Sequence, residues 1–262
     1  MMEKNKIALS GGREGAIFLQ GERVVRPANP WTEEVHSFLR FLRERGIDYV
    51  PIPYGRNEEG QEVLSFVEGK IFHEALPVSL YTDEFLRSVA KLLLDYHSHS
   101  KEYISRLTGR ENYMLSPVEP IEVMCHGDFA PYNVTVEGDL PKGIIDFDTL
   151  HPGPAMWDVV YGIYRFVPFM CPTNPEYKGP LKEQIRRMKV FLDAYGISKE
   201  QREQVVPLLL QRLAHLTDYM KCQAALGNQD VISNIERGDL KIYLQDMEYI
   251  RSNHDIIVKS IN

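Results

Sequence analysis

Residues 126–133 read HGDFAPYN, and residues 144–148 read IIDFD. The first segment combines a His, an Asp and an Asn, and Asp146 follows Asn133 by thirteen positions. Asp128 and Asn133 alone could form an Asx-rich turn, because both residue types bond to nearby backbone. The addition of Asp146 at the end of an apolar run favours a chemical interpretation, since three polar positions and their spacing must agree at once.

Phosphoryl transfer from a nucleotide needs this set of groups. One carboxylate must face the acceptor hydroxyl, while an amide oxygen and a second carboxylate hold Mg²⁺ on the phosphates. Protein kinases use H-R-D-x-x-x-x-N followed by D-F-G for these tasks. Here His126, Asp128 and Asn133 keep the His, Asp and Asn at that spacing. Gly127 replaces the Arg, and residues 146–148 (DFD) stand at the D-F-G position.

The two motifs resemble those of the aminoglycoside phosphotransferase and choline kinase family, the small-molecule branch of the kinase-like fold. Three flanking segments are similar to that family as well. VLSFVEG at 63–69 resembles its inter-lobe hinge, LLLDYHS at 92–98 resembles a leucine-rich helix end, and GPAMWDVVY at 153–161 resembles its Gly-x-Pro-x-x-Asp-Leu segment. The resemblance covers most of residues 7–165 and predicts an α+β, two-lobed protein-kinase-like fold.

The resemblance implies a role for each motif residue. Asp128 would be the catalytic aspartate that orients the acceptor hydroxyl. Asn133 and Asp146 would bind Mg²⁺ through oxygen ligands, which this hard cation prefers. His126 would anchor the loop. The hinge residues that would bind the nucleotide, ATP or GTP, are Phe66 and Val67.

The N-terminal pieces of the site are less regular. SGGREG at 10–15 carries Gly11, Gly12 and Gly15, which form either a phosphate-covering loop or only a hairpin. Arg26 occupies the place of the family's nucleotide-positioning lysine, and Arg is not interchangeable with Lys.

The carboxylate partner of that lysine is also displaced. The family's helical glutamate would align near Val35. Glu33 or Glu34 could replace it only with a shifted register. These departures bear on reaction rate and nucleotide affinity more than on the fold.

Two aspartates beside the motifs stay open. Asp148 either joins the metal site or caps the next turn. Asp158 is predicted to begin a helix, where it fixes the catalytic loop or caps that helix, because Asp favours such positions. The aromatic residues near the motifs are predicted to lie on a helix face in the core: Tyr132, Trp157, Tyr161 and Tyr164.

Residues 1–69 are predicted to form the nucleotide-binding lobe. Short apolar runs and Gly-rich turns at 7–27 indicate an antiparallel sheet. Residues 30–46 predict an amphipathic helix with Thr32 as N-cap and Gly46 as its stop, and 49–69 predict two strands around an Asn-Glu-Glu-Gly turn.

Residues 70–262 are predicted to form a mostly helical catalytic and substrate-binding lobe. A central helix at 81–99 would bury Phe85, Leu86, Val89, Leu92, Leu93 and Tyr96. Short strands would follow at 117–150. Further helices are predicted at 181–195, 200–226 and 239–251, and Pro207 would begin or kink the middle one.

The composition of the chain argues against some classes of binding partner. The 262 residues carry a net charge of −7, which offers no basic face for nucleic acid or anionic lipid. No apolar run approaches the roughly 20 residues of a membrane span. The three cysteines are widely spaced, which suits a reducing compartment. We therefore expect a cytoplasmic protein without nucleic-acid or membrane partners, whose oligomeric state the sequence leaves open.

The predicted activity is transfer of the γ-phosphoryl group of ATP or GTP to a hydroxyl of a small molecule. Aminoglycoside-type antibiotics head the acceptors by resemblance; amino alcohols, sugars and amino acids stay open. The chain is also similar to a subgroup named for toxin immunity, on PW at 30–31, DFDT at 146–149 and HPGP at 151–154. The alternative is thus a catalytically weak, nucleotide-binding immunity or regulatory protein on a kinase-like scaffold.

Overall fold

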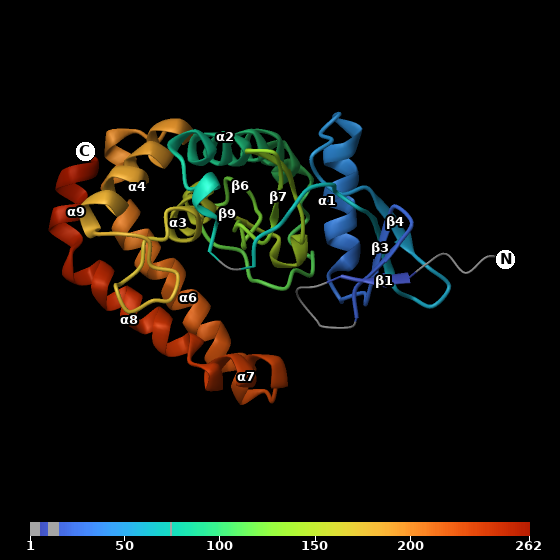
Figure 1. The fold of residues 1–262 in the computed structure, drawn as a ribbon. Coiled ribbons are helices and arrows are strands. Elements are labelled where there is room, and N and C mark those ends of the chain that lie inside the picture. The colour runs from blue at the N-terminus through green and yellow to red at the C-terminus, as the bar shows by residue number, and fades with distance from the viewer. Residues whose placement is uncertain (1–5, 10–15, 74) are drawn as a thin grey trace. The chain divides into compact units, whose positions relative to one another are not determined.

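The computed structural model describes residues 6–9, 16–73 and 75–262 (Figure 1). The chain divides into two compact units. One contains residues 1–76 and 94–155, and the other contains residues 77–93 and 156–262. The sheet and both sequence motifs therefore belong to the same unit. The predicted boundary of a nucleotide-binding lobe at residue 69 stays a prediction.

The first unit begins with a five-stranded antiparallel sheet, which confirms the strands predicted on either side of the first helix. Its strand order is β1-β2-β3-β5-β4. The strands are β1 Lys6–Ala8, β2 Phe18–Gln20, β3 Arg23–Arg26, β4 Pro53–Arg56 and β5 Glu62–Ser65. The predicted turn lies between β4 and β5, where the side-chain oxygen of Asn57 accepts from the backbone N–H groups of Glu59 and Gln61. Side-chain bonds of this kind are typical of Asx turns.

Helix α1, Thr32–Glu44, packs against the sheet through an apolar stripe. The predicted residues Val35, Phe38, Leu39 and Leu42 are all at most 1% exposed. The predicted N-cap was wrong: Trp31 holds that position, and Oγ1 of Thr32 instead accepts from the backbone N–H of Asn29 at 2.9 Å. The predicted stop was right, since the helix ends at Glu44 and Gly46 follows with a φ of +80°.

Helix α2, Asp83–Ser100, is the predicted central helix. Its predicted apolar face is buried except for Leu92, which is half-buried. The strands after it are β6 Val123–Cys125, β7 Val134–Glu137, β8 Leu140–Ile144 and β9 His151–Gly153. β6 pairs with β9 and β7 pairs with β8, both antiparallel. These short ribbons confirm the predicted change of pattern, and they frame the two motifs.

Residues 156–262 are mostly helical. The helices are α3 Ala155–Phe166, α4 Leu181–Tyr195, α5 Lys199–Arg202, α6 Val205–Ala225, α7 Gln229–Arg237, α8 Asp239–Ser252 and α9 His254–Ile261. The predictions at 181–195 and 239–251 are confirmed. The predicted helix at 200–226 is divided into α5 and α6, and Pro207 lies in the first turn of α6, where proline is tolerated. Helices α7 and α9 were not predicted.

A buried carboxylate organises this unit. Asp246 of α8 is fully buried and accepts hydrogen bonds from Tyr164 Oη, the backbone N–H of Cys171 and Asn174 Nδ2, each at 2.7 Å. Three donors compensate a charge that would be costly to bury alone. Three aromatic residues of α3 are buried in the core, as predicted: Trp157, Tyr161 and Tyr164.

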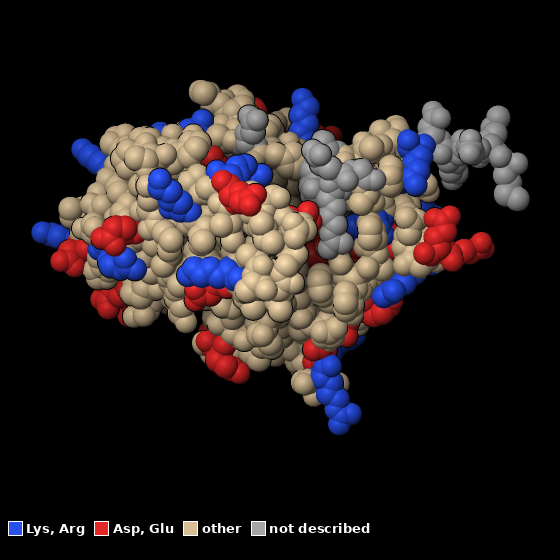
Figure 2. Space-filling view, turned by 90° about the horizontal axis from the view of Figure 1, so that it is seen from below, with Lys and Arg blue, Asp and Glu red and all other residues tan. Residues whose placement is uncertain are grey.

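The surface carries both signs of charge. On the face shown in Figure 2, basic and acidic side chains are interspersed among uncharged ones. Within the described part of the chain, no helix is long and apolar enough to cross a membrane.

Candidate functional site

The strands bring the two motifs to one place. The first motif follows β6 and ends as β7 begins, and the second motif starts in the last residue of β8. The backbone N–H of Ile145 donates to the carbonyl of Asn133 at 2.9 Å, which ties the second motif to the first. The spacing of residues along the chain thus becomes a fixed spacing in the structure.

His126 contacts the backbone of both motifs. Its ring is fully buried. Nε2 lies 2.9 Å from the carbonyl oxygen of Ile145, and Nδ1 lies 3.2 Å from the backbone nitrogen of Asp128. Because a carbonyl only accepts and a backbone N–H only donates, the ring carries its hydrogen on Nε2. The ring of Phe147 packs against it at a centroid distance of 4.8 Å. This geometry supports the anchoring role predicted for His126.

Gly127 is required by the backbone between His126 and Asp128. Its φ is +82°, and a Cβ atom there would lie 2.3 Å from the carbonyl oxygen of Thr149. The hydroxyl of Thr149 in turn donates to the carbonyl of His126 at 2.8 Å. No side chain fits between these segments, which explains why Gly stands where protein kinases have Arg.

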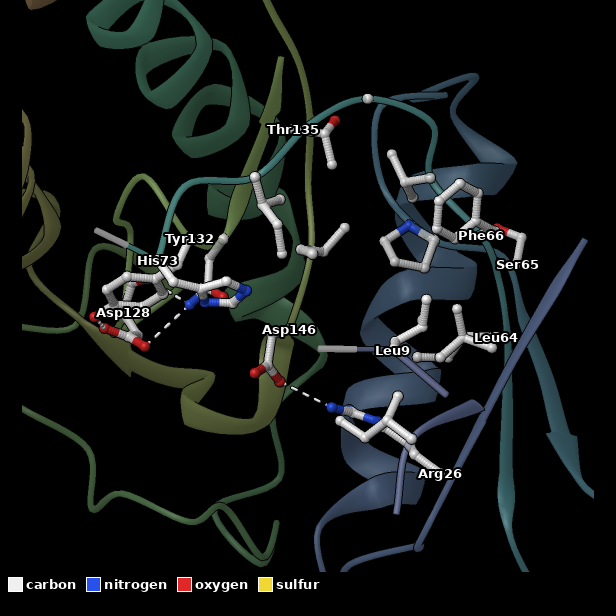
Figure 3. A pocket seen from close by; sticks show the side chains of 18 residues that line it. Leu9, Arg26, Leu64, Ser65, Phe66, His73, Asp128, Tyr132, Thr135 and Asp146 are labelled. Carbon is white, nitrogen blue, oxygen red and sulfur yellow. Dashed lines mark hydrogen bonds and ion pairs between the residues drawn. The ribbon is translucent and has the colours of Figure 1, made fainter. Parts of the chain in front are cut away.

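Asp128 is held from both sides (Figure 3). Tyr132 Oη donates to Oδ1 at 2.7 Å, and Asn133 Nδ2 donates to Oδ2 at 3.0 Å. Asn133 Nδ2 also bonds to the backbone carbonyl of Asp128 at 2.9 Å. The amide nitrogen of Asn133 is thus directed to Asp128, which leaves its oxygen as the group that can face a cation. The prediction that Tyr132 lies on a helix face was wrong, because it lies in the turn before β7 and lines the cavity.

Asp146 adopts a strained backbone. Its φ of 60° and ψ of 73° lie in the left-handed region, which non-glycine residues seldom enter and which is concentrated at functional sites. Its side chain is 46% exposed, and Oδ1 accepts from Nη1 of Arg26 at 2.8 Å. Burial raises the pKa of Asp146, but the positive charge and hydrogen bond of Arg26 outweigh burial, so the net pKa lies below its usual range.

Arg26 joins the sheet to the second motif. Its guanidinium bonds to Glu62, to Asp146 and, through Nη2, to Oδ1 of Asp148 at 2.9 Å. Burial lowers the pKa of Arg26, yet the three carboxylates outweigh burial and raise it. The structure places neither predicted helical partner beside Arg26. Glu33 bonds to Arg56, and Glu34 bonds to the backbone of Asn112.

Asp148 contacts residues that neither interpretation of its sequence position included. One carboxylate oxygen accepts from Arg26, and the other accepts from Asn29 Nδ2 at 3.1 Å. Burial raises the pKa of Asp148, the charge of Arg26 opposes this shift, and the nearby charge of Asp146 adds to it. In this arrangement Asp148 links the guanidinium of Arg26 to Asn29, in the segment that precedes α1.

Asp128 and Asp146 line a cavity of about 490 Å³ (Figure 3). One wall is apolar. Val24 and Leu64 come from β3 and β5, and the other residues flank the strands or follow β5: Leu9, Ile17, Pro51, Phe66, Val67 and Ile71. The other wall holds Asp128, Asn133 and Asp146. An apolar slot beside convergent polar groups is the usual form of a small-molecule site.

The predicted hinge borders this cavity. Phe66 and Val67 both line it, which is consistent with their predicted contact with a nucleotide. The backbone N–H of Phe66 already donates to the carbonyl of Glu22 at 2.8 Å. A contact of Phe66 with a ligand would therefore use its ring or its carbonyl. Beyond the hinge, Lys70 exchanges two backbone hydrogen bonds of 2.8 Å with Val136 of β7.

The remaining predicted site residues are the three glycines and Asp158. Gly11, Gly12 and Gly15 fall outside the described residues. Asp158 lies in the first turn of α3 and is fully buried, in the compact unit that does not contain the cavity. Its carboxylate is in the turn where a helix dipole favours negative charge.

Two polar residues at the site, Glu62 and His73, were not among the residues predicted from the sequence, and Tyr132 was predicted only as a core aromatic. Glu62 bonds to Arg26, and Tyr132 bonds to Asp128. His73 lines the cavity near Asp128 in Figure 3. Glu62 shares a face of β5 with Leu64, which lines the cavity, because side chains two residues apart point to the same face of a strand.

Known proteins that are similar to this chain include phosphotransferases and kinases. A model of the Phosphotransferase enzyme family matches residues 113–177, the segment that contains both motifs. The structure is similar to a choline/ethanolamine kinase family protein from Mesorhizobium loti, with a TM-score of 0.61 and 14% identity over 98% of this chain and 92% of that one. The predicted resemblance to the aminoglycoside phosphotransferase and choline kinase family is confirmed.

Two further proteins are similar to this chain, one in fold and one in sequence. Amicoumacin kinase in complex with AMP-PNP, Ca²⁺ and Ami has a TM-score of 0.60 and 10% identity, over 97% of this chain and 88% of that one. In sequence, the chain is 25% identical over 222 residues to a trifolitoxin immunity protein of Rhizobium leguminosarum bv. trifolii, covering 80% of this chain and 82% of that protein. The chain thus has a kinase-like fold, with an antiparallel sheet in its N-terminal region and a mostly helical remainder.

Proposed function

We propose that the protein transfers the γ-phosphoryl group of ATP or GTP to a hydroxyl of a small molecule. The observation that supports this most strongly is the presence of Asp128, Asn133 and Asp146 on one wall of the cavity, opposite an apolar wall. Phosphoryl transfer depends mainly on positioning and charge stabilisation, and these residues supply both.

Asp128 is the group that meets the acceptor hydroxyl. An ionised carboxylate orients a hydroxyl and can accept its proton. The bonds from Tyr132 and Asn133 fix the direction of both oxygens. Asp128 therefore begins each turnover in one orientation, which reduces the entropy lost on reaching the reactive geometry.

The residues present fit Mg²⁺. Asn133 and Asp146 offer an amide oxygen and a carboxylate, which are hard ligands. Among the described residues, no group of three or more His, Cys, Asp or Glu could hold a metal ion. Mg²⁺ commonly uses one or two protein oxygens together with substrate phosphates, so a nucleotide would complete the site. When bound, the ion would neutralise negative charge on the phosphates.

The apolar wall suits a purine base, and Arg26 lies where it can reach the phosphates. Its planar guanidinium can bind phosphate oxygens with two hydrogen bonds. If the guanidinium of Arg26 exchanged its bond to Asp146 for a bond to a phosphate, its bond to Glu62 would still hold it in place. ATP and GTP both fit this description, and the cytoplasm, where both are abundant, is the proposed location.

The acceptor is a small molecule with a free hydroxyl, and aminoglycoside-type antibiotics come first on family resemblance. The test is a screen of hydroxyl-bearing compounds for acceptor-stimulated consumption of ATP or GTP, with the Asp128→Ala protein as the blank. The proposal expects at least one compound to stimulate consumption by the wild type alone. Stimulation that persists in Asp128→Ala would contradict the role of this carboxylate.

A second candidate is a catalytically weak, nucleotide-binding immunity or regulatory protein. Two observations favour it: the replacement of the usual lysine by Arg26, and the similarity to a trifolitoxin immunity protein. This function requires nucleotide binding but no transfer. Biological activity that survives Asp128→Asn would support it against the kinase proposal.

A further inference from the structure

Arg26 and Glu62 face each other across two neighbouring strands. The register of β3 and β5 pairs these two residues directly. Their side chains form a hydrogen-bonded ion pair, with the Nε of Arg26 donating to Oε2 of Glu62. Directly opposite positions in an antiparallel pair bring side chains closest, so the ion pair follows from the sheet itself.

Glu62 has a second partner beneath the sheet. Its other oxygen, Oε1, lies 2.8 Å from Nε2 of His36, which comes from helix α1. The Glu62 side chain is 1% exposed and the His36 side chain is fully buried. Because the carboxylate is held ionised by Arg26, it accepts, and the hydrogen of the imidazole lies on Nε2. Both oxygens of this buried carboxylate are thus bonded, as a buried charge requires.

The helical glutamates are engaged elsewhere. Glu33 lies 3.1 Å from Nε of Arg56, and its side chain is 60% exposed. Glu34 accepts from the backbone N–H of Asn112 at 3.2 Å. Helix α1 therefore contributes an imidazole to this cluster, in the region where protein kinases contribute a glutamate.

We propose that Glu62 and His36 are the positioning residues for Arg26, and that they replace the strand-to-helix ion pair of protein kinases with a pair formed inside the sheet. His36 orients Glu62, and Glu62 directs the guanidinium toward the cavity. In protein kinases, movement of the helix makes or breaks the corresponding pair. Here the two charged residues lie on paired strands, so their contact persists whenever the sheet is folded.

The inference rests on the proposed function in one respect: Arg26 must bind the phosphates of the nucleotide. The test measures the dissociation constant of ATP with Mg²⁺ for the wild-type chain and its variants. Glu62→Gln removes the charge and keeps the shape. Glu33→Gln and Glu34→Gln apply the same change to the helix and serve as matched controls.

Glu62→Gln is expected to weaken ATP binding about tenfold or more, since the guanidinium of Arg26 loses its charge-assisted hydrogen bond to Glu62. Both controls should bind within about twofold of the wild type, because Glu33 forms an exposed ion pair with Arg56 and Glu34 accepts an exposed hydrogen bond from the backbone of Asn112, and neither contact involves Arg26. In an Arg26→Met background, Glu62→Gln should have no further effect, since a positioning residue acts only through the group it positions. An equal loss in that background would indicate a merely structural role and overturn the proposal.

His36 provides a second route if Glu62→Gln does not fold. His36→Gln retains an N–H donor that can reach Glu62, whereas His36→Phe removes it. The proposal expects weaker ATP binding in His36→Phe and substantial recovery in His36→Gln. Equal affinities in the two variants would contradict it. If the wild type binds no nucleotide, the proposed function fails too; normal binding with an unaffected Glu62→Gln variant refutes the positioning pair alone.

Discussion

Nη1 of Arg26 lies 2.8 Å from Oδ1 of Asp146, so the residue proposed to bind phosphate is bonded to a residue proposed to bind Mg²⁺. The contact links β3 to the loop after β8. A nucleotide with its metal would compete for both partners. Arg26 would exchange the carboxylate for phosphate oxygens, and Asp146 would exchange the guanidinium for a cation, so charge stays balanced throughout.

Arg26→Ala should raise the KM for the nucleotide while leaving the KM for the acceptor nearly unchanged. Loss of a charge-assisted bond is expected to change nucleotide affinity about tenfold or more. Steady-state kinetics with each substrate varied in turn provides the measurement. If Arg26→Ala alters neither constant, Arg26 does not contact the phosphates.

Arg26→Lys gives the companion measurement. Lys is a point charge that cannot bond to Glu62, Asp146 and Asp148 in the same planar arrangement. Lower turnover in this variant would show that the site is adapted to arginine. Improved turnover would instead favour the catalytically weak scaffold.

Nucleotide should stabilise the protein strongly only when Mg²⁺ or Mn²⁺ is present. Asn133 and Asp146 are too few to hold the ion without phosphate oxygens. At a ligand concentration near 100 Kd, binding should add about 2.7 kcal/mol of stability. Thermal unfolding with ATP in Mg²⁺, ATP in EDTA and Mg²⁺ alone separates the contributions. Equal increases in Tm in the two ATP samples would contradict the assignment of Asn133 and Asp146 as Mg²⁺ ligands.

Tyr132→Phe should lower kcat without a large change in nucleotide affinity. The phenolic hydroxyl bonds to Oδ1 of Asp128 at 2.7 Å, and its loss frees that oxygen to rotate. A bond to a charged group contributes roughly 1.5–3 kcal/mol, so a decrease of roughly ten- to a hundredfold is expected. Tyr49→Phe is the matched control, because Tyr49 makes a 2.7 Å bond to the exposed Asp95. Equal effects of the two changes would argue against a specific role for Tyr132.

The buried Glu62 should make stability depend on pH. Burial raises its pKa, but the bonds from His36 and Arg26 outweigh burial and place the net pKa below its usual range. A depressed carboxylate pKa stabilises the folded state above the unfolded value, about pH 4.3, and this stabilisation is lost as pH falls through the folded value. The difference in Tm between the wild type and Glu62→Gln should therefore be constant near neutrality and shrink in acid. A difference that does not change down to the acid limit of folding would exclude this linkage.

The sequence predicts what is local in this site and misses what depends on strand register. His126, Asp128 and Asn133 sit within one short loop, so their spacing alone indicates their relationship. Glu62 lies on β5, and its contact with Arg26 exists only because β5 pairs with β3. No spacing along the chain encodes that pairing.

Most of the predicted helices are confirmed, and the errors that remain concern an N-cap and helices that bury few residues. The apolar stripe of α1 was clear, but its N-cap depends on the bond between Asn29 and Thr32, which forms only in the folded turn. Helix α7 has no buried residue and was not predicted. Pro207 was interpretable because proline fits the first turn of a helix whatever surrounds it.

The final prediction separates a kinase from a nucleotide-binding scaffold, and it rests on different tasks for two carboxylates. Asp146→Asn should lose Mg²⁺-dependent nucleotide binding and transfer together, because a neutral amide is a weaker ligand for a hard cation. Asp128→Asn keeps the shape of the side chain and should bind nucleotide nearly as the wild type does. Its defect should appear in kcat, by roughly 10²–10⁴-fold, the usual contribution of a general base.

Nucleotide affinity and acceptor-dependent turnover, measured on both variants, test this split. The neutral amide of Asp128→Asn can still bond to Tyr132, so loss of turnover would reflect the missing charge rather than a disordered loop. Should Asp128→Asn keep full biological activity while Asp146→Asn loses it, nucleotide binding alone is the function. A split between binding and turnover identifies Asp128 as the group that acts on the acceptor.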